Sequence, residues 1–411
     1  MKVCRVLGVL VLSFLPMAAL RAEDKKDEGF VPMFNGKDLT GWVNVNCHPD
    51  TFFVKDDMII TTGKPTGFLR TTKQYENFIA EFDWFHVNTK EVGNSGFFVW
   101  ADPIPATGTG YTRGIEVQVL VNLEKKDHYT SQGDLFSIWG ATCKPVRPHP
   151  QGWSRCLPSE NRCKGGGEWN HYKVIADNGV IKLHVNGKEV SGVSECNPRK
   201  GYLALESEGA ECRFRNLKIK ELPTTNPKKE EIADEDKGFT SLYTGLDLKN
   251  WKAAEANKGH WKPSDWVLHA DGKGGELLSE KEFGDYELIV DWKLPAAKKD
   301  EKATGSIGLS VRQTDLARTG ISIGADGKVS VSEMAGNAVG IIVPAEMKEV
   351  KPAGQWNRTT VTQKGDHFTV QVNGKTILEN IQSQTKTNKG RISLSSAGAA
   401  DFANIFIREL K

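Results

Sequence analysis

The chain has 411 residues, of which 38% are hydrophobic and 26% are charged, a globular composition that excludes disordered, collagen-like and coiled-coil proteins. The length predicts two or three domains at roughly 100–200 residues each. Removing the three basic residues among the first 22 leaves 51 basic residues against 52 acidic ones, and this near-neutral chain lacks the basic footprint of a nucleic-acid or anionic-membrane binder.

The N-terminus has the pattern of an export signal. Two basic residues precede an apolar run over residues 6–15, and small residues follow up to Ala22. A charged start, a short apolar stretch and a small-residue exit are typical of a secretory signal peptide, whereas a membrane span needs about 20 apolar residues. We predict that residues 1–22 form a signal peptide, with Ala19 as the alternative cleavage position. The mature chain is then periplasmic or extracellular and has no membrane span.

Six cysteines follow the predicted signal peptide, all of them before residue 213. An even number in an exported protein indicates disulfides, but six cysteines allow 15 pairings, so the connectivity stays open. Cys143, Cys156 and Cys163 share one Gly/Pro-rich stretch, where we expect at least one disulfide. A zinc site is the rival interpretation, and it needs ligand pairs such as CxxC, which the sequence lacks.

The chain contains two copies of one series of landmarks in the same order. The matched segments are 34–42 with 243–251, 83–84 with 291–292, 93–96 with 305–308, 168–170 with 355–357, 185–188 with 372–375, and 216–222 with 404–410. We therefore predict a first domain over residues 29–222 and a second, degenerate domain over 238–411. The segment 223–237 between them has eight charged residues in fifteen and two prolines, as expected of a solvated linker.

Each copy has the pattern of β-structure. Apolar and polar residues alternate over 78–87 and again over 115–119, which is the period of a half-buried strand. The stretch 172–190 contains two Asn-Gly pairs between β-prone runs, which indicates two hairpins. Many short strands and Gly-rich turns predict an all-β fold, with a two-sheet sandwich or jelly roll in each copy.

One strand of the first copy carries the strongest candidate site. Within residues 114–120 the apolar residues face the core, so Glu116 and Gln118 project together onto the outer face of the sheet. The second copy has Ser322 and Gly324 at these positions and keeps the apolar ones. We interpret this difference as a site present in the first copy and lost in the second.

Other polar and aromatic residues of the first copy are candidates for substrate binding. Asn94 lies in a Gly-flanked turn where its amide could bind hydroxyl groups, Trp100 could stack on a sugar ring, and Glu206 follows an alternating run. Residues that flank the Glu116 strand could converge on it: Tyr111, Arg113, His128, Tyr129 and Asp134.

Several mechanisms find no support in the sequence. It contains no GxSxG elbow, HExxH motif, P-loop or GxGxxG after a strand. A retaining glycosidase needs two carboxylates ~5–5.5 Å apart, and the position two residues after Glu116 is a glutamine. A mechanism with two carboxylates would have to recruit a second acid from Glu81, Asp83, Asp134 or Glu206.

At these motifs the chain resembles the 3-keto-disaccharide hydrolase family. The resemblance rests on residues 34–42, 93–96, 114–120, 129–134, 168–170 and 214–219. It covers about 190 residues of the first copy and the framework of the second. The resemblance implies a concanavalin A-like jelly roll in each copy and an oxidised glycoside as the substrate. Family members often have an acid just after the Glu-x-Gln strand, where this chain has Val121.

The chemistry that the resemblance implies needs only one base. A ketone at C3 of a sugar acidifies the hydrogen on C2, and its removal lets the C1 oxygen leave by β-elimination, after which water can add back. Such a route needs a base near C2 and a donor or cation for the developing oxyanion. Glu116 is the expected base or the ligand of a divalent cation, and Gln118 and Asn94 would orient the substrate. A carbohydrate-binding module without catalysis and a structural surface protein remain as alternatives, since fold alone does not decide function.

Overall fold

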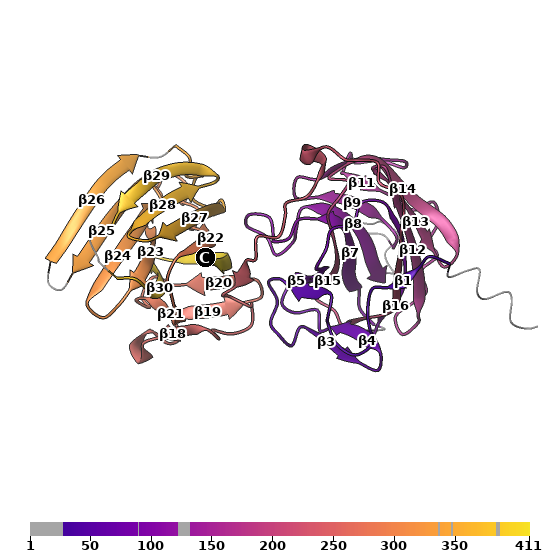
Figure 1. Ribbon diagram of the computed structural model, residues 1–411, viewed down its shortest axis with the longest axis horizontal. Coiled ribbons are helices and arrows are strands. Elements are labelled where there is room, and N and C mark those ends of the chain that lie inside the picture. Colours follow the sequence, from indigo (N-terminus) through magenta and orange to yellow (C-terminus); the bar gives the residue numbers. More distant parts are fainter. Residues whose placement is uncertain (1–27, 89, 122–131, 336–337, 347, 384–386) are drawn as a thin grey trace, which may run out of the picture.

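The computed structural model describes residues 28–88, 90–121, 132–335, 338–346, 348–383 and 387–411. The predicted signal peptide, His128 and Tyr129 lie outside these residues. Within the described ranges, no helix has the length and apolar character needed to cross a bilayer. The described chain is almost entirely β-structure, arranged as two sandwiches that lie side by side (Figure 1). The prediction of two tandem jelly-roll sandwiches is confirmed.

The first sandwich consists of a nine-stranded sheet with the order β10-β14-β13-β12-β6-β16-β4-β3, with β1 beside β16, and a seven-stranded sheet with the order β11-β9-β8-β7-β15-β5-β2. The bounds of its strands are β1 (Val31–Pro32), β2 (Trp42–Asn44), β3 (Phe52–Lys55), β4 (Met58–Thr61), β5 (Gly67–Thr71), β6 (Phe78–His86), β7 (Gly93–Ala101), β8 (Gly114–Val121), β9 (Leu135–Ile138), β10 (Thr142–Pro145), β11 (Arg155–Cys156), β12 (Asn170–Asp177), β13 (Val180–Val185), β14 (Lys188–Asn197), β15 (Tyr202–Ser207) and β16 (Cys212–Glu221). A short 3₁₀ helix, η1 (Lys229–Glu231), follows.

The second sandwich repeats this plan with an eight-stranded sheet, β19-β20-β31-β22-β27-β28-β29 with β17 beside β31, and a seven-stranded sheet, β18-β21-β30-β23-β24-β25-β26. The bounds are β17 (Thr240–Ser241), β18 (Trp251–Ala253), η2 (Glu255–Asn257), β19 (Trp261–Ser264), β20 (Val267–Ala270), β21 (Leu277–Phe283), β22 (Tyr286–Lys293), β23 (Ser306–Gln313), β24 (Ala317–Gly324), β25 (Lys328–Ala335), β26 (Ala338–Glu346), β27 (Asn357–Lys364), β28 (His367–Val372), β29 (Lys375–Gln382), β30 (Gly390–Ala397) and β31 (Ala400–Glu409).

The strand pattern follows from the sequence. Along β6, residues alternate between buried and half-buried, so Phe82 and Trp84 enter the core while Glu81 and Asp83 face outward. The two Asn-Gly pairs connect β12 to β13 and β13 to β14, and all four residues have positive φ. Asparagine and glycine tolerate that backbone conformation, which two-residue hairpin turns require.

Most residues of the charged segment 223–237 are exposed, and a few contacts attach the segment to the first sandwich. The Asp236 carboxylate accepts a hydrogen bond from Arg70 Nη2 at 2.6 Å, and the Arg70 side chain is only 2% exposed. Ala233 is buried, and its carbonyl accepts a hydrogen bond from Gln74. Composition alone predicts the solvated character of this linker, but it cannot show these tertiary contacts.

The six described cysteines are free thiols. No disulfide is seen among the described cysteines, so the bridge expected in the stretch that contains Cys143, Cys156 and Cys163 is not shown. Cys156 and Cys163 are buried, and Cys163 lies near the hydroxyl of Tyr172.

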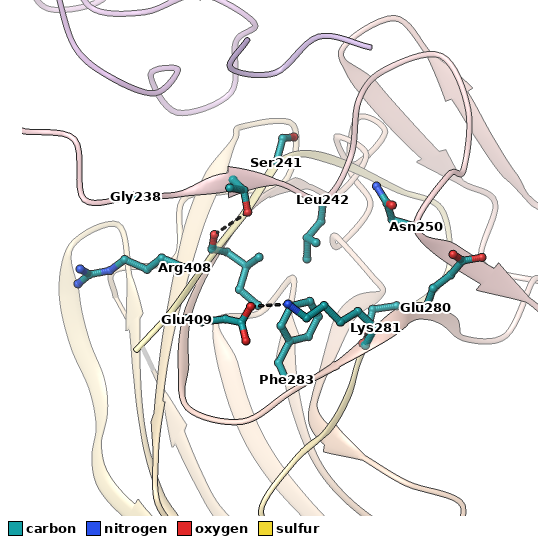
Figure 2. A pocket seen from close by; sticks show the side chains of 12 residues that line it. Gly238, Ser241, Leu242, Asn250, Glu280, Lys281, Phe283, Arg408 and Glu409 are labelled. Atoms are coloured by element: carbon teal, nitrogen blue, oxygen red, sulfur yellow. Dashed lines mark hydrogen bonds and ion pairs between the residues drawn. The ribbon is translucent and has the colours of Figure 1, made fainter. Parts of the chain in front are cut away.

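A pocket of about 400 Å³ in the second sandwich lies between β17, β21 and β31, and Figure 2 shows the Lys281–Glu409 ion pair at its wall. The first sandwich has the same arrangement, because Lys73 pairs with Glu221 at 2.6 Å and lies over the Tyr75 ring as Lys281 lies over Phe283. Both copies keep this ion pair, so it is a feature of the shared fold and gives no evidence of a functional site.

The buried residues between the two sheets determine the stability of the first sandwich. We expect Leu205→Ala, which truncates a fully buried β15 side chain, to lower the free energy of unfolding by about 2–5 kcal/mol. Val146 is 65% exposed, so Val146→Ala should change it by less than about 0.5 kcal/mol. Urea denaturation of both variants measures the difference, and equal midpoints would contradict this description of the core.

Candidate functional site

The candidate site lies on the outer face of the seven-stranded sheet of the first sandwich. Along β8, Ile115, Val117 and Val119 belong to the core between the sheets. Successive side chains of a strand point to opposite faces, so Glu116 and Gln118 lie on the outer face. This is the orientation that the alternation in the sequence predicts.

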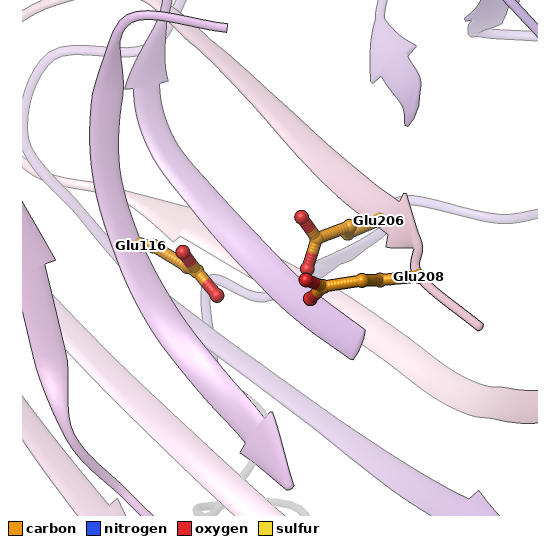
Figure 3. A group of neighbouring side chains, drawn as sticks. All are labelled: Glu116, Glu206 and Glu208. Atoms are coloured by element: carbon orange, nitrogen blue, oxygen red, sulfur yellow. The ribbon is translucent and has the colours of Figure 1, made fainter. Parts of the chain in front are cut away.

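Three carboxyl groups meet on this face and form what we call the acidic cluster: Glu116, Glu206 and Glu208. Oxygen atoms of the three residues all lie within 4.8 Å of one another, and Figure 3 shows Glu206 and Glu208 directed toward Glu116. Gly96 on β7 lies between them: a Cβ there would stand 2.7 Å from Glu206 Oε2 and 3.0 Å from Glu116 Oε1. The glycine therefore leaves the space in which the carboxyl groups approach.

A chain of hydrogen bonds fixes one side of the cluster. Gln118 Nε2 donates to Asn94 Oδ1 at 2.6 Å, and Asn94 Nδ2 donates to Glu208 Oε2. Tyr111 Oη donates to the other Glu208 oxygen at 2.7 Å. Asn94, Gln118, Glu116 and Glu206, all candidates from the sequence, thus converge around Glu208.

Glu206 is the most confined member of the cluster. Its side chain is 1% exposed, and neither carboxylate oxygen has a hydrogen-bond partner among the described residues. The carboxyl groups of Glu206 and Glu208 can form a hydrogen bond to each other only when one of them carries a proton, because two ionised carboxylates have no proton to donate. A buried carboxylate without a partner is costly, so the arrangement favours a shared proton or a bound cation.

The pKa values of the cluster follow from this crowding. Burial is the main cause that raises the pKa of Glu116 and of Glu206 well above the ordinary value, and the negative charge of Glu208 adds to both shifts. The pKa of Glu208 is also raised by burial, against the hydrogen bond from Tyr111, which lowers it. Carboxyl groups this close cannot all ionise together, so the cluster holds both proton donor and acceptor forms.

Arg155 and Asp134 form a buried ion pair beside the cluster. The Arg155 guanidinium lies over the Phe136 ring at 4.4 Å and opposes the rise in the pKa of Glu116. Asp134, expected to bind substrate, is fully buried and contacts Arg155. In the structure, Asp134 holds the Arg155 guanidinium near Glu116.

The structure places two sequence candidates away from the cluster. Trp100 is fully buried in the core, and its Nε1 donates to the Glu76 carbonyl at 2.8 Å. The expected stacking on a sugar is wrong, because a register shift between β7 and β15 and a φ of 57° turn the ring inward. Arg113 donates two hydrogen bonds to Asp102, at 2.7 and 2.9 Å. It therefore stabilises the loop before β8 and has no hydrogen bond to the cluster.

Sequence analysis missed Glu208, Arg155 and Gly96. Glu208 could have been found from the same reasoning that singled out Glu116, because it follows Glu206 by two residues and the second copy has Ala397 there. Arg155 offered no such signal, since it comes from the two-residue strand β11 in an irregular stretch. Only the pairing of β11 with β9 brings it to this face.

The second sandwich keeps the geometry of this face without its acids. Gly308 pairs with Ser322 across β23 and β24 as Gly96 pairs with Gln118 across β7 and β8. Glu116, which pairs with Phe98, therefore corresponds to Gly320, which pairs with Ser310, and not to Ser322 as the sequence comparison predicted. Ser395 takes the place of Glu206, and a Cβ on Gly308 would meet its hydroxyl. The described residues of the second sandwich thus have no counterpart of the acidic cluster.

Comparisons with known proteins give the family. A sequence profile of the 3-keto-alpha-glucoside-1,2-lyase-like domain matches residues 29–220 and 238–408. No curated protein matches the chain. Among solved structures, two candidate glycosyl hydrolases from Parabacteroides distasonis have 24% and 21% identity, cover 49% and 47% of this chain and 98% and 99% of their own, and give TM-scores of 0.37 and 0.35. The carbohydrate-binding module CBM66 from Bacillus subtilis has 15% identity, covers 38% of this chain and 93% of its own, and gives a TM-score of 0.31.

At these TM-scores the structural similarities carry no functional argument. The two profile matches together span most of the chain, one in each sandwich. The chain therefore belongs to the family of 3-keto-alpha-glucoside-1,2-lyase-like domains, of which it contains two tandem copies.

Proposed function

We propose that the first sandwich cleaves 3-keto-glycosides at the acidic cluster, by β-elimination followed by addition of water. Membership of the family supports a carbohydrate-active protein. The observation that carries the proposal is the crowding of three carboxyl groups with raised pKa values on one face. The N-terminal pattern supports export of this enzyme, which would place the reaction outside the cytoplasm.

The mixed protonation of the cluster suits this reaction. The ionised member takes the proton from C2, which the C3 ketone has acidified, and the electron pair forms the enolate. The C1–O bond then breaks, a double bond forms between C1 and C2, and the protonated member donates its proton to the leaving oxygen. A base whose pKa lies near the working pH is the most effective, so the raised pKa values move the effective pH range of these carboxyl groups above that of an ordinary glutamate.

Each residue has a place in this scheme. Glu116, which Arg155 keeps closer to its ionised form, is the proposed base. Glu206, buried and without a partner, is the proposed acid. Asn94 and Gln118 are the proposed groups that orient the sugar hydroxyl groups or the oxyanion, and their hydrogen bonds to each other and to Glu208 fix them beside the cluster.

The acidic cluster also suits a divalent cation. Carboxylate oxygens are the ligands that hard cations prefer, and the unpartnered oxygens of the buried Glu206 are directed into the cluster. Glu116, Glu206 and Glu208 would hold the ion. A bound cation would stabilise negative charge on the enolate oxygen.

We expect Glu116→Gln and Glu206→Gln each to lower kcat/KM for a 3-keto-disaccharide by about 10²–10⁴-fold, the usual contribution of a general acid or base. Ser395→Ala in the second sandwich is the matched control and should leave the rate unchanged. The unoxidised parent disaccharide should not be cleaved, because its C2 hydrogen is not acidified. Turnover by both glutamine variants at the wild-type rate would refute the proposal, and binding without turnover by the wild type would favour a lectin.

We expect the ionisation of Glu206 to lower the free energy of unfolding as the pH rises. Because its pKa is raised in the folded state, the unfolded chain loses this proton at a lower pH than the folded chain. Stability contributed by the protonated form is present below about pH 4.3, the unfolded value, and is lost as the pH rises through the folded pKa.

Glu206→Gln keeps the side chain neutral, so we expect it to raise Tm above the wild type at pH 8, by about 2–4 °C for each kcal/mol relieved, and to match the wild type at pH 4. Thermal unfolding in the presence of a chelator measures this effect. A lower Tm at pH 8 would show that Glu206 has a compensating partner.

Cation binding can be measured without a substrate. We expect Mn²⁺, followed by electron paramagnetic resonance, to bind at a single site that Glu116→Gln and Glu208→Gln weaken by tenfold or more. Glu333, a buried acid of the second sandwich, provides the control variant Glu333→Gln, which should bind as the wild type does. Equal Mn²⁺ affinity in all variants would place the ion elsewhere.

A further inference from the structure

The second sandwich packs against the face of the first that carries the acidic cluster. Phe68, Phe98 and Ala204 of the first sandwich form one apolar cluster with Ile289 and Phe406 of the second. Phe68 lies opposite Glu206, and Phe98 lies opposite Glu116, in neighbouring strands. The contact between the sandwiches is therefore continuous with the candidate site.

Polar residues of the second sandwich hold a loop of the first. We call residues 102–113, which join β7 to β8, the rim loop, and Asp291, Arg358 and Asn404 the clamp. Asp291 Oδ2 accepts a hydrogen bond from the Gly108 amide at 2.8 Å, and Arg358 Nη2 donates to the Pro105 carbonyl at 2.9 Å.

Asn404 completes the clamp. Its Nδ2 donates to the carbonyls of Ala106 and Thr109, at 3.2 and 2.9 Å, and to Asp291 Oδ2 at 2.8 Å. Asp291 is fully buried and pairs with Arg358 Nε at 2.7 Å. Three side chains of the second sandwich thus fix four backbone groups of the rim loop.

The shape of the loop also depends on the second sandwich. Gly108 lies directly on Trp356, since a Cβ there would stand 2.3 Å from the indole Cγ. Two residues after the last clamped carbonyl comes Tyr111, whose hydroxyl donates to Glu208. The position of that hydroxyl is therefore set by backbone that the clamp holds.

The residues of the first sandwich that correspond to the clamp are Asp83, His171 and Asn216, and they are at least partly exposed. We call them the reference triad. Asn216 Nδ2 donates to Asp83 Oδ2 at 2.8 Å, as Asn404 does to Asp291, and the His171 ring bonds to Asp83 at 2.8 Å. The triad lines a cavity of about 870 Å³. The Asp83 side chain is 18% exposed, against 0% for Asp291.

The residues next to the clamp are apolar and those next to the reference triad are charged, as expected if only the clamp lies in the contact between the sandwiches. Ile289 pairs with Phe406 across β22 and β31, and both are buried. At the same cross-strand position of the first sandwich, Glu81 pairs with Lys218, and their charged groups lie 3.4 Å apart. At this position the sheet face of the second sandwich is apolar and that of the first is charged, so of these two faces the one on the second sandwich is suited to docking.

We propose that the second sandwich is a positioning unit for the acidic cluster: the clamp fixes the rim loop and thereby holds the Tyr111 hydroxyl on Glu208. The proposal rests on the proposed function for its effect on catalysis. It assigns a role to the copy that lacks the acids, and it makes Asp291, Arg358 and Asn404 positioning residues of a site in the other copy.

The test compares Asn404→Gly with Asn216→Gly. Both asparagines have positive φ, 46° and 54°, which glycine adopts without strain, so each variant loses one side chain of the same geometry. We expect hydrogen exchange of the Gly108 amide to become at least tenfold faster in Asn404→Gly and to stay unchanged in Asn216→Gly. Arg358→His, which installs the residue of the reference triad, is the second clamp variant. Unchanged exchange in both clamp variants would overturn the proposal.

Catalysis gives the second readout. We expect Asn404→Gly to lower kcat for a 3-keto-disaccharide by roughly tenfold or more, because small displacements of positioned groups have large effects, and to change KM little. Tyr111→Phe should have an effect of similar size. The double variant should be no slower than Tyr111→Phe alone, since both changes remove one interaction. Fully additive losses, or an unchanged kcat in Asn404→Gly, would overturn the proposal.

A third readout needs no substrate and separates this proposal from the proposed function. The Ala106 amide donates to the Tyr111 carbonyl at 2.9 Å, so its hydrogen exchange reports on the backbone that carries Tyr111. Asn404→Gly should speed the exchange of this amide, and Asn216→Gly should leave it as in the wild type. If the wild type cleaves no 3-keto-glycoside, the proposed function fails, and this exchange rate still decides whether the clamp positions Tyr111.

Discussion

The structure of the candidate site depends on the approach of three carboxyl groups over one glycine. A side chain at Gly96 would collide with Glu206 and Glu116. Burial raises the pKa values of all three acids, and repulsion by Glu208 raises those of Glu116 and Glu206 further. Crowded acids oppose folding, so the surrounding contacts must compensate for them. Asn94 and Tyr111 donate to Glu208, and the Arg155 guanidinium faces Glu116. The raised pKa values of the cluster and its cost to stability have the same physical origin.

The two sandwiches show how a duplicated fold can divide its roles. Both keep the Asp–Trp strand, one Asn-Gly hairpin turn (Asn186-Gly187 and Asn373-Gly374) and the asparagine at a left-handed backbone position, since these make the sheets. The first sandwich has Glu116 and Glu206 where the second has Gly320 and Ser395. The second has apolar residues where the first has Glu81 and Lys218. The differences between the copies therefore lie on their outer faces, where they change what each copy binds, while the cores remain alike.

Much of this organisation could be predicted from the sequence because it follows from local periodicity and repetition. Alternation placed Glu116 on the outer face, and the repeats located both sandwiches. Three features could not be predicted in that way. The inward turn of Trp100 depends on a register shift between strands that are about 100 residues apart in the chain. Arg155 reaches the site through the pairing of two short strands. The hold of Asn404 on the rim loop spans 298 residues, and no local pattern encodes it.

The attachment of the segment 223–237 to the first sandwich has a consequence for the strength of the contact between the copies. Asp236 is tied to Arg70, and β17 of the second sandwich begins at Thr240, so only a few residues separate the two units. A short tether makes docking intramolecular, at an effective concentration in the millimolar range. Surfaces that would not associate as separate molecules at cellular dilution can then remain together, and the clamp can open and close again without the partners diffusing apart.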